Sequence, residues 1–153
     1  MSRKSKRSVD PVPPVVVLDS NVFISFLLKS PSSRALIAEW RRGSFEAAIS
    51  TSLLRELRRV LKRPKFQKRI SHEDIEELIT FINETALFVH PITLRDRICR
   101  DKTDDKVFAC AFAAGATCVV SGDKDVLTAG PIGGLLVCSP RDFLAWLKRR
   151  HPT

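Results

Sequence analysis

The sequence predicts an α/β protein with a central, mainly parallel sheet. Two apolar runs, at residues 15–18 and 116–121, lack the alternation of a half-buried strand and therefore predict strands buried on both faces. Segments whose apolar residues recur at helical spacing separate these runs from each other and from shorter candidate strands. Strands that alternate with helices are typical of a parallel sheet covered by helices.

Each element has a local signal in the sequence. Short apolar or β-branched runs predict the strands, and apolar residues three and four positions apart predict the helices. The expected strands, in chain order, cover residues 15–18, 46–50, 86–89, 116–121 and 135–138. The expected helices, in chain order, cover residues 22–28, 34–42, 51–63, the stretch after Ser71 that holds Ile75, Leu78, Ile79 and Ile82, then 103–114 and 141–150.

Prolines, serines and a glycine predict where several helices begin or end. Pro31 and Pro64 are expected to end the first and third helices, because proline breaks the hydrogen bonding of a helix interior. Ser32 or Ser33 is expected to cap the second helix, and Gly43 to stop it. The helix at 103–114 is apolar nearly all round, which predicts that it is buried.

Length and composition predict one folded domain over residues 15–150. The chain has 153 residues, of which 44% are hydrophobic, enough for a substantial core. Residues 1–14 are basic and proline-rich, so we expect them to form a flexible tail. The net charge of +9 favours an anionic partner, most commonly nucleic acid, although a soluble protein with a basic tail is the alternative.

The apolar runs and the cysteines argue against a membrane protein, a secreted protein and a zinc site. No apolar run is long enough to span a membrane, and no apolar segment follows the basic start, so we expect a cytoplasmic protein without a membrane partner. The four cysteines, Cys99, Cys110, Cys118 and Cys138, form no C-x-x-C pair, which argues against a zinc site. Cys110 and Cys118 lie in apolar runs and are interpreted as small core residues.

Acidic residues recur where the predicted strands end and helices begin. In parallel sheets, ligands bind beyond the carboxyl ends of the strands. Asp19 stands at that point of the first strand, so it is either a site residue or the N-cap of the next helix. The other acids in comparable positions are Glu56, Asp104, Asp105, Asp123 and Asp125.

Most of these acids also have a structural explanation. Glu56 shares a helix side with Leu53 and Val60, so it faces the edge of the core and needs either a metal or a neighbouring arginine. Asp104 and Asp105 can stabilise a helix start by ~0.3–1 kcal/mol each through the helix dipole. Asp123 follows Ser-Gly, a pair that favours a turn by itself.

Gathered at one sheet edge, these carboxylates would repel one another unless a cation joined them. Ligands that are all carboxylate oxygens favour Mg²⁺ or Mn²⁺, and such an ion assists the attack of water on a phosphodiester. Basic side chains would then hold the phosphate backbone. Arg55, Lys102 and Lys124 are candidates for such contacts.

Four segments, in order, resemble the PIN-domain family, and most closely its bacterial VapC-like toxin branch. They are Val-Val-Val-Leu-Asp-Ser-Asn-Val, Leu-Leu-Arg-Glu-Leu, Thr-Asp-Asp-Lys-Val-Phe-Ala-Cys-Ala and Cys-Val-Val-Ser-Gly-Asp-Lys-Asp-Val-Leu, spread over roughly residues 15–145. The resemblance implies a three-layer α/β/α domain and a Mg²⁺- or Mn²⁺-dependent ribonuclease. It also implies a homodimer and a cognate antitoxin protein.

The resemblance assigns residues as well. Asp19, Glu56, Asp104 and Asp123 match the family's four acids, with Asp105 as the fallback for the third and Asp125 as a further acid found in some members. Asn21 and Ser121 match polar positions that orient the ligands. Lys102 stands where close relatives often have proline, a departure that removes no ligand.

These observations lead to one main expectation. We expect a metal-dependent endoribonuclease that hydrolyses RNA phosphodiester bonds and is the toxin of a type II toxin–antitoxin pair. The alternative is a non-catalytic RNA-binding or regulatory PIN-like module that has kept the acids. A phosphatase with Asp19 as nucleophile is disfavoured, because Asn21 stands where its second acid is usually found.

Overall fold

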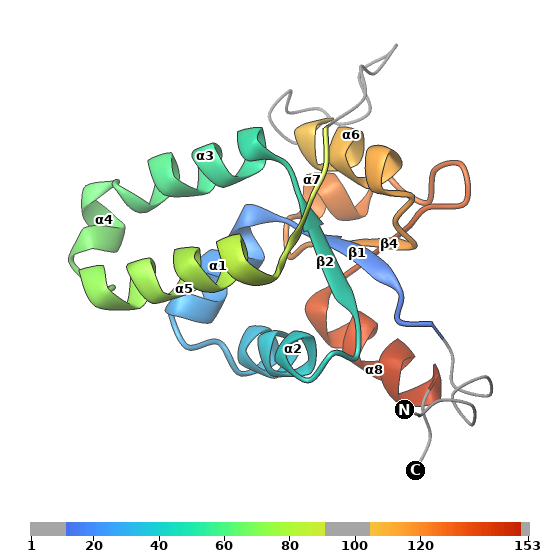
Figure 1. Cartoon of the computed structure of the whole chain (residues 1–153), viewed down its shortest axis with the longest axis horizontal. Coiled ribbons are helices and arrows are strands. Elements are labelled where there is room, and N and C mark those ends of the chain that lie inside the picture. Colours follow the sequence, from blue (N-terminus) through green and yellow to red (C-terminus); the bar gives the residue numbers. More distant parts are fainter. Residues whose placement is uncertain (1–11, 91–104, 151–153) are drawn as a thin grey trace.

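The computed structural model describes residues 12–90 and 105–150 (Figure 1). Its five strands are β1 (Val15–Leu18), β2 (Glu46–Ile49), β3 (Leu87–Phe88), β4 (Cys118–Val120) and β5 (Leu136–Cys138). Its helices are α1 (Ser20–Leu27), α2 (Pro31–Arg41), α3 (Thr51–Leu61), α4 (Pro64–Gln67), α5 (His72–Thr85), α6 (Asp105–Ala114), α7 (Lys124–Leu127) and α8 (Pro140–Arg150).

The strands form one sheet in the order β3-β2-β1-β4-β5, and every neighbouring pair is parallel. β1 is central, with Val17 opposite Ala48 of β2 and Val119 of β4. Helix α6 covers one face of the sheet, whereas α2 and α8 pack together on the other (Figure 1). This arrangement confirms the predicted α/β class with a parallel central sheet.

Burial explains why the two apolar runs became neighbouring central strands. Val16 and Val17 of β1 and Val119 and Val120 of β4 are completely buried. A strand without an exposed face must lie inside a sheet that is covered on both sides. Because β1 and β4 run in the same direction side by side, the residues that follow them emerge together at one edge.

The prediction that prolines end the helices was wrong. Pro31 and Pro64 instead occupy the first turns of α2 and α4, where the missing N–H costs no hydrogen bond and the fixed φ suits a helix. The N-cap of α2 is therefore Ser30, and the expected caps Ser32 and Ser33 lie inside the helix. The short helices α4 and α7 were not predicted.

Other boundaries agree more closely. Ser71 caps α5 as expected, because its Oγ accepts a hydrogen bond from the Asp74 N–H at 3.0 Å. Gly43 follows α2 with a φ of +86°, a conformation that glycine adopts without strain. Helix α1 begins at Ser20 rather than at the expected Val22, because Asp19 is its N-cap.

Several predictions lie outside the described residues. They concern most of the expected tail and the start of the expected helix at 103–114, with Cys99, Lys102 and Asp104 among the residues affected. Within the ranges that the structure does describe, none of the helices is long and apolar enough to cross a lipid bilayer.

The aromatic cluster beneath the sheet gives a test of the core. Phe45 is 1% exposed, and its ring lies 5.2 Å from that of Phe143 on α8 and 6.5 Å from that of Trp40 on α2. Phe45→Ala should lower the free energy of unfolding by about 3–5 kcal/mol, because it leaves a cavity between these rings. Urea denaturation measures this loss. Phe88→Ala is the control, since Phe88 is 45% exposed, and an equal loss in both variants would contradict this packing.

Candidate active site

Asp19 lies at the carboxyl end of β1 and is only 5% exposed. One carboxylate oxygen, Oδ1, accepts a hydrogen bond from the Ser20 N–H at 2.8 Å. The other, Oδ2, accepts one from Ser121 Oγ at 2.7 Å. Asp19 is thus the N-cap of α1 and also lies at the sheet edge where ligands bind, so the two interpretations left open by the sequence are compatible.

Ser121 joins the ends of the two central strands. Its hydroxyl donates to Asp19 and accepts from the Asp123 N–H at 2.9 Å, and its own N–H donates to the Cys138 carbonyl at 3.0 Å. Ser121 is fully buried, so these partners hold its side chain in one place. Asn21 adds a second link between the same loops, because its Oδ1 accepts from the Gly122 N–H at 3.2 Å.

Asp123 follows β4 and is the N-cap of α7. Its Oδ1 accepts a hydrogen bond from the Asp125 N–H at 2.9 Å, which confirms the turn-forming role that the sequence allowed. Asp105 opens α6, and Lys124 opens α7 with an exposed side chain. Asp123 and Asp19 share Ser121 as a hydrogen-bond partner, because Ser121 Oγ bonds to the Asp19 carboxylate and to the Asp123 N–H.

Glu56 reaches the same region from α3 and is 8% exposed. Its Oε2 accepts a long hydrogen bond from Ser20 Oγ at 3.4 Å. Its Oε1 lies 3.6 Å from Lys106 Nζ and 3.9 Å from the Arg59 guanidinium, and it has no hydrogen-bond partner within the described structure. The arginine alternative from the sequence is thus present, but only at long range.

Lys106 and Ser20 are site residues that the sequence analysis missed. Lys106 is the single cation in the sequence of α6, an otherwise apolar helix that begins with Asp105. A single lysine in an apolar helix was the feature of the sequence that could have identified Lys106 as a candidate. Its contact with Glu56 could not be foreseen, because it depends on how α6 and α3 pack against each other.

Burial raises the pKa of Asp19 above its ordinary value of 3.8, and the negative charges of Asp123 and Glu56 raise it further. The hydrogen bonds from Ser121 and the Ser20 N–H act in the opposite direction on this pKa. The charges of Asp123 and Glu56 therefore act on the Asp19 carboxylate. A divalent cation would relieve this repulsion directly.

The described acids do not form a closed metal cage by themselves. In residues 12–90 and 105–150, no three His, Cys, Asp or Glu side chains are grouped tightly enough to hold an ion. The electrostatic coupling is consistent with this result, because charges interact over longer distances than metal–oxygen bonds span. The donor set still suits Mg²⁺ or Mn²⁺, since it consists of carboxylate oxygens and Glu56 Oε1 lacks a hydrogen bond in the described structure.

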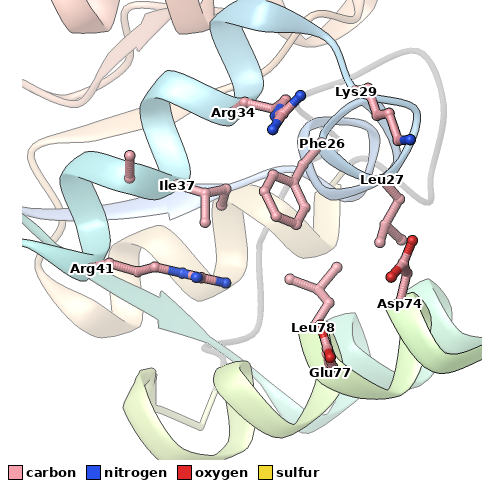
Figure 2. A pocket seen from close by; sticks show the side chains of 10 residues that line it. Phe26, Leu27, Lys29, Arg34, Ile37, Arg41, Asp74, Glu77 and Leu78 are labelled. Carbon is pink, nitrogen blue, oxygen red and sulfur yellow. The ribbon is translucent and has the colours of Figure 1, made fainter.

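The hollow between α1, α2 and α5 is not part of this site. Figure 2 shows its apolar floor, with arginines from α2 on one side and acids from α5 on the other. The charged residues among those that line it are Lys29, Arg34, Arg41, Asp74 and Glu77. Of the acids proposed from the sequence, none of those that the structure describes lines this hollow.

Asp19→Asn should change how stability depends on pH. Because the pKa of Asp19 is raised in the folded chain, its charged form costs stability at neutral pH, and this cost disappears as the pH falls through that pKa. In urea denaturation without divalent ions, the wild type should therefore gain stability relative to Asp19→Asn between about pH 7 and about pH 4. A difference that stays constant over this range would contradict the buried, repelled carboxylate.

Residues 15–125 match the family model of the PIN domain, more than half of the chain. A search of curated proteins found no match. PIN domains are generally nucleases that bind nucleic acid, and they typically use divalent metals. The parallel sheet, with its buried Asp19 at the carboxyl edge, agrees with this match. The chain therefore belongs to the PIN domain family.

Proposed function

We propose that this PIN domain is an endoribonuclease that requires Mg²⁺ or Mn²⁺. The observation that supports it best is the buried carboxylate of Asp19, which shares Ser121 with Asp123 and is electrostatically coupled to Glu56. In a nuclease, such a group of carboxylates would provide the negative charge that binds a divalent cation. Asp104, outside the described residues, is proposed as the remaining ligand, with Asp105 and Asp125 as secondary candidates.

Each residue has a proposed role. Asp19 and Asp123 would bind the ion, and Glu56 would complete its coordination shell, either directly or through a water molecule. The bound ion would polarise the scissile phosphodiester and favour deprotonation of the attacking water. Ser121 and Asn21 would orient the two loops, because their hydrogen bonds link β1 to the turn after β4. Lys106 would balance the charge of Glu56, which it contacts at 3.6 Å, and would donate to a phosphate oxygen of the bound RNA.

RNA binding has its own support in a basic band on α3, α4 and the turn after them. All its side chains are exposed, and the helix that carries the first of them turns Glu56 towards the site. The basic band consists of Arg55, Arg58, Arg59, Lys62, Arg63, Lys65, Lys68 and Arg69. The neighbouring helix α5 instead exposes acids, namely Glu73, Asp74, Glu76, Glu77 and Glu84.

This separation of charge would guide a phosphate backbone. Phosphates would be attracted along α3 towards Glu56 and repelled from α5. A single strand suits the site, because its phosphates can reach a recessed edge more easily than those of a stiff duplex. Lys124, exposed on α7, and Lys102, outside the described residues, are proposed as further phosphate contacts.

The toxin role, a cognate antitoxin and a homodimer are proposed from the motif resemblance alone. A non-catalytic RNA-binding module is the second candidate, and one observation favours it: the described acids do not form a closed metal group. Binding of RNA without turnover in excess Mn²⁺ would support that candidate over the nuclease.

Asp19→Asn should reduce cleavage of a single-stranded RNA by on the order of 100-fold or more, since it removes charge stabilisation of several kcal/mol. Cleavage is measured with Mg²⁺ or Mn²⁺ on a labelled oligonucleotide. The control is Glu76→Gln, an exposed acid on α5, which should retain wild-type activity. Full activity in a folded Asp19→Asn protein would refute the proposed site.

Neutralising part of the basic band should weaken RNA binding. In the Asp19→Asn background, the triple change Arg58→Gln, Lys62→Gln and Lys65→Gln should lower affinity. It should also reduce the slope of log affinity against log salt by about 0.7 for each phosphate that is no longer neutralised. Fluorescence anisotropy at several salt concentrations measures both effects.

The matched control removes the same charge from another helix. Arg141→Gln, Lys148→Gln and Arg149→Gln neutralise three exposed cations of α8. This control should lose much less affinity, because α8 carries no residue of the site. Equal losses in the two triple variants would show that net charge alone, rather than the basic band, determines RNA binding.

A further inference from the structure

Cys118 and Cys138 form a close pair of thiols beside the candidate site. They lie on β4 and β5, which are neighbouring parallel strands, and their Sγ atoms are 2.8 Å apart. Both are free cysteines. A disulfide bond has an S–S length of about 2.05 Å, so the sulfur atoms need to approach by roughly 0.8 Å for a bond to form.

The two thiols differ in ways that suit a stepwise oxidation. Cys118 is 2% exposed, whereas Cys138 is only partly buried and can meet a small oxidant. The hydrogen bond between the two thiols lowers the pKa of Cys138, although burial and the Asp142 charge oppose this effect. The same hydrogen bond, together with burial, raises the pKa of Cys118. Cys138 is therefore the better nucleophile and Cys118 the resolving thiol.

Hydrogen bonds through Ser121 connect this pair to the acids. The Cys138 carbonyl accepts from the Ser121 N–H at 3.0 Å, and the Ser121 hydroxyl bonds to both Asp19 and the Asp123 N–H. Any shift of β5 relative to β4 therefore acts on Ser121, which bonds to the Asp19 carboxylate and to the backbone of Asp123. The third described thiol, Cys110, is buried on α6, where burial raises its pKa to about 12.

We propose that Cys118 and Cys138 are a redox modification site, at which a peroxide forms a reversible disulfide between β4 and β5 and so weakens the nuclease site through Ser121. The effect on activity rests on the proposed function, whereas formation of the disulfide does not. In the parallel ladder Cys118 is opposite Leu136 and Cys138 is opposite Val120, so the disulfide would join diagonal neighbours and would shift β5 relative to β4.

The chemistry balances in two steps. The Cys138 thiolate attacks a peroxide oxygen, so an S–O bond forms, the O–O bond breaks, and hydroxide leaves and takes a proton to become water. Cys118 sulfur then attacks the sulfenic acid, so an S–S bond forms, the S–O bond breaks, and a second water leaves with the Cys118 proton. Overall, two thiols are oxidised and one hydrogen peroxide is reduced to two waters.

The test treats the full chain with hydrogen peroxide and maps its disulfides by mass spectrometry after alkylation of the remaining thiols. We expect a peptide that links Cys118 to Cys138 and is released by dithiothreitol. We also expect RNA cleavage with Mg²⁺ or Mn²⁺ to fall on the order of tenfold, as for loss of a residue that orients metal ligands, and to recover on reduction.

Three variants make the result specific. Cys138→Ala and Cys118→Ala should each prevent the loss of activity, and either one suffices if the other fails to fold. Cys110→Ala should respond to peroxide as the wild type does. Absence of the linked peptide, or a linked protein that keeps full activity, would overturn the proposal. If the reduced protein cleaves no RNA at all, the proposed function fails, and the linked peptide still decides whether the redox site exists.

Discussion

The confinement of Asp19 between other acids is the constraint on which the rest of the site depends. A buried carboxylate is costly, and the charges of Asp123 and Glu56 add to this cost by raising its pKa. Hydrogen bonds from Ser121 and the Ser20 N–H offset part of it. Among the described residues, Lys106 and Arg59 contact Glu56, at 3.6 Å and 3.9 Å, and no ion pair to Asp19 is found. The chain therefore keeps a negative region that a dication would complete.

The parallel sheet makes this confinement possible. β1 and β4 are neighbours and point the same way, so Asp19 and Asp123 emerge together although they are far apart in sequence. Fully buried valines on both strands fix their register, and Ser121 then bridges the two ends. Packing of this core thus offsets the repulsion between the acids that the strand ends bring towards one another.

How far the sequence predicts this site differs from residue to residue. Asp19 and Asp123 were placed correctly at strand ends because unbroken apolar runs precede them, and Glu56 was placed at the core edge by helical spacing. The contact of Lys106 with Glu56 and the pairing of Cys118 with Cys138 were not predictable, because both depend on which elements pack side by side. The prolines at 31 and 64 were misread because the same ring that ends a helix also suits its first turn.

The proposed cation site between Asp19 and Asp123 is tested by soaking a crystal of the protein in Mn²⁺ and recording anomalous scattering near the manganese absorption edge. We expect a strong anomalous peak at the carboxyl edge of β1 and β4, contacted by the carboxylates of Asp19 and Asp123, with Glu56 alongside. The same map would place Asp104 relative to the ion. Saturating Mn²⁺ with no peak at this edge, or a peak held by other residues, would contradict the account.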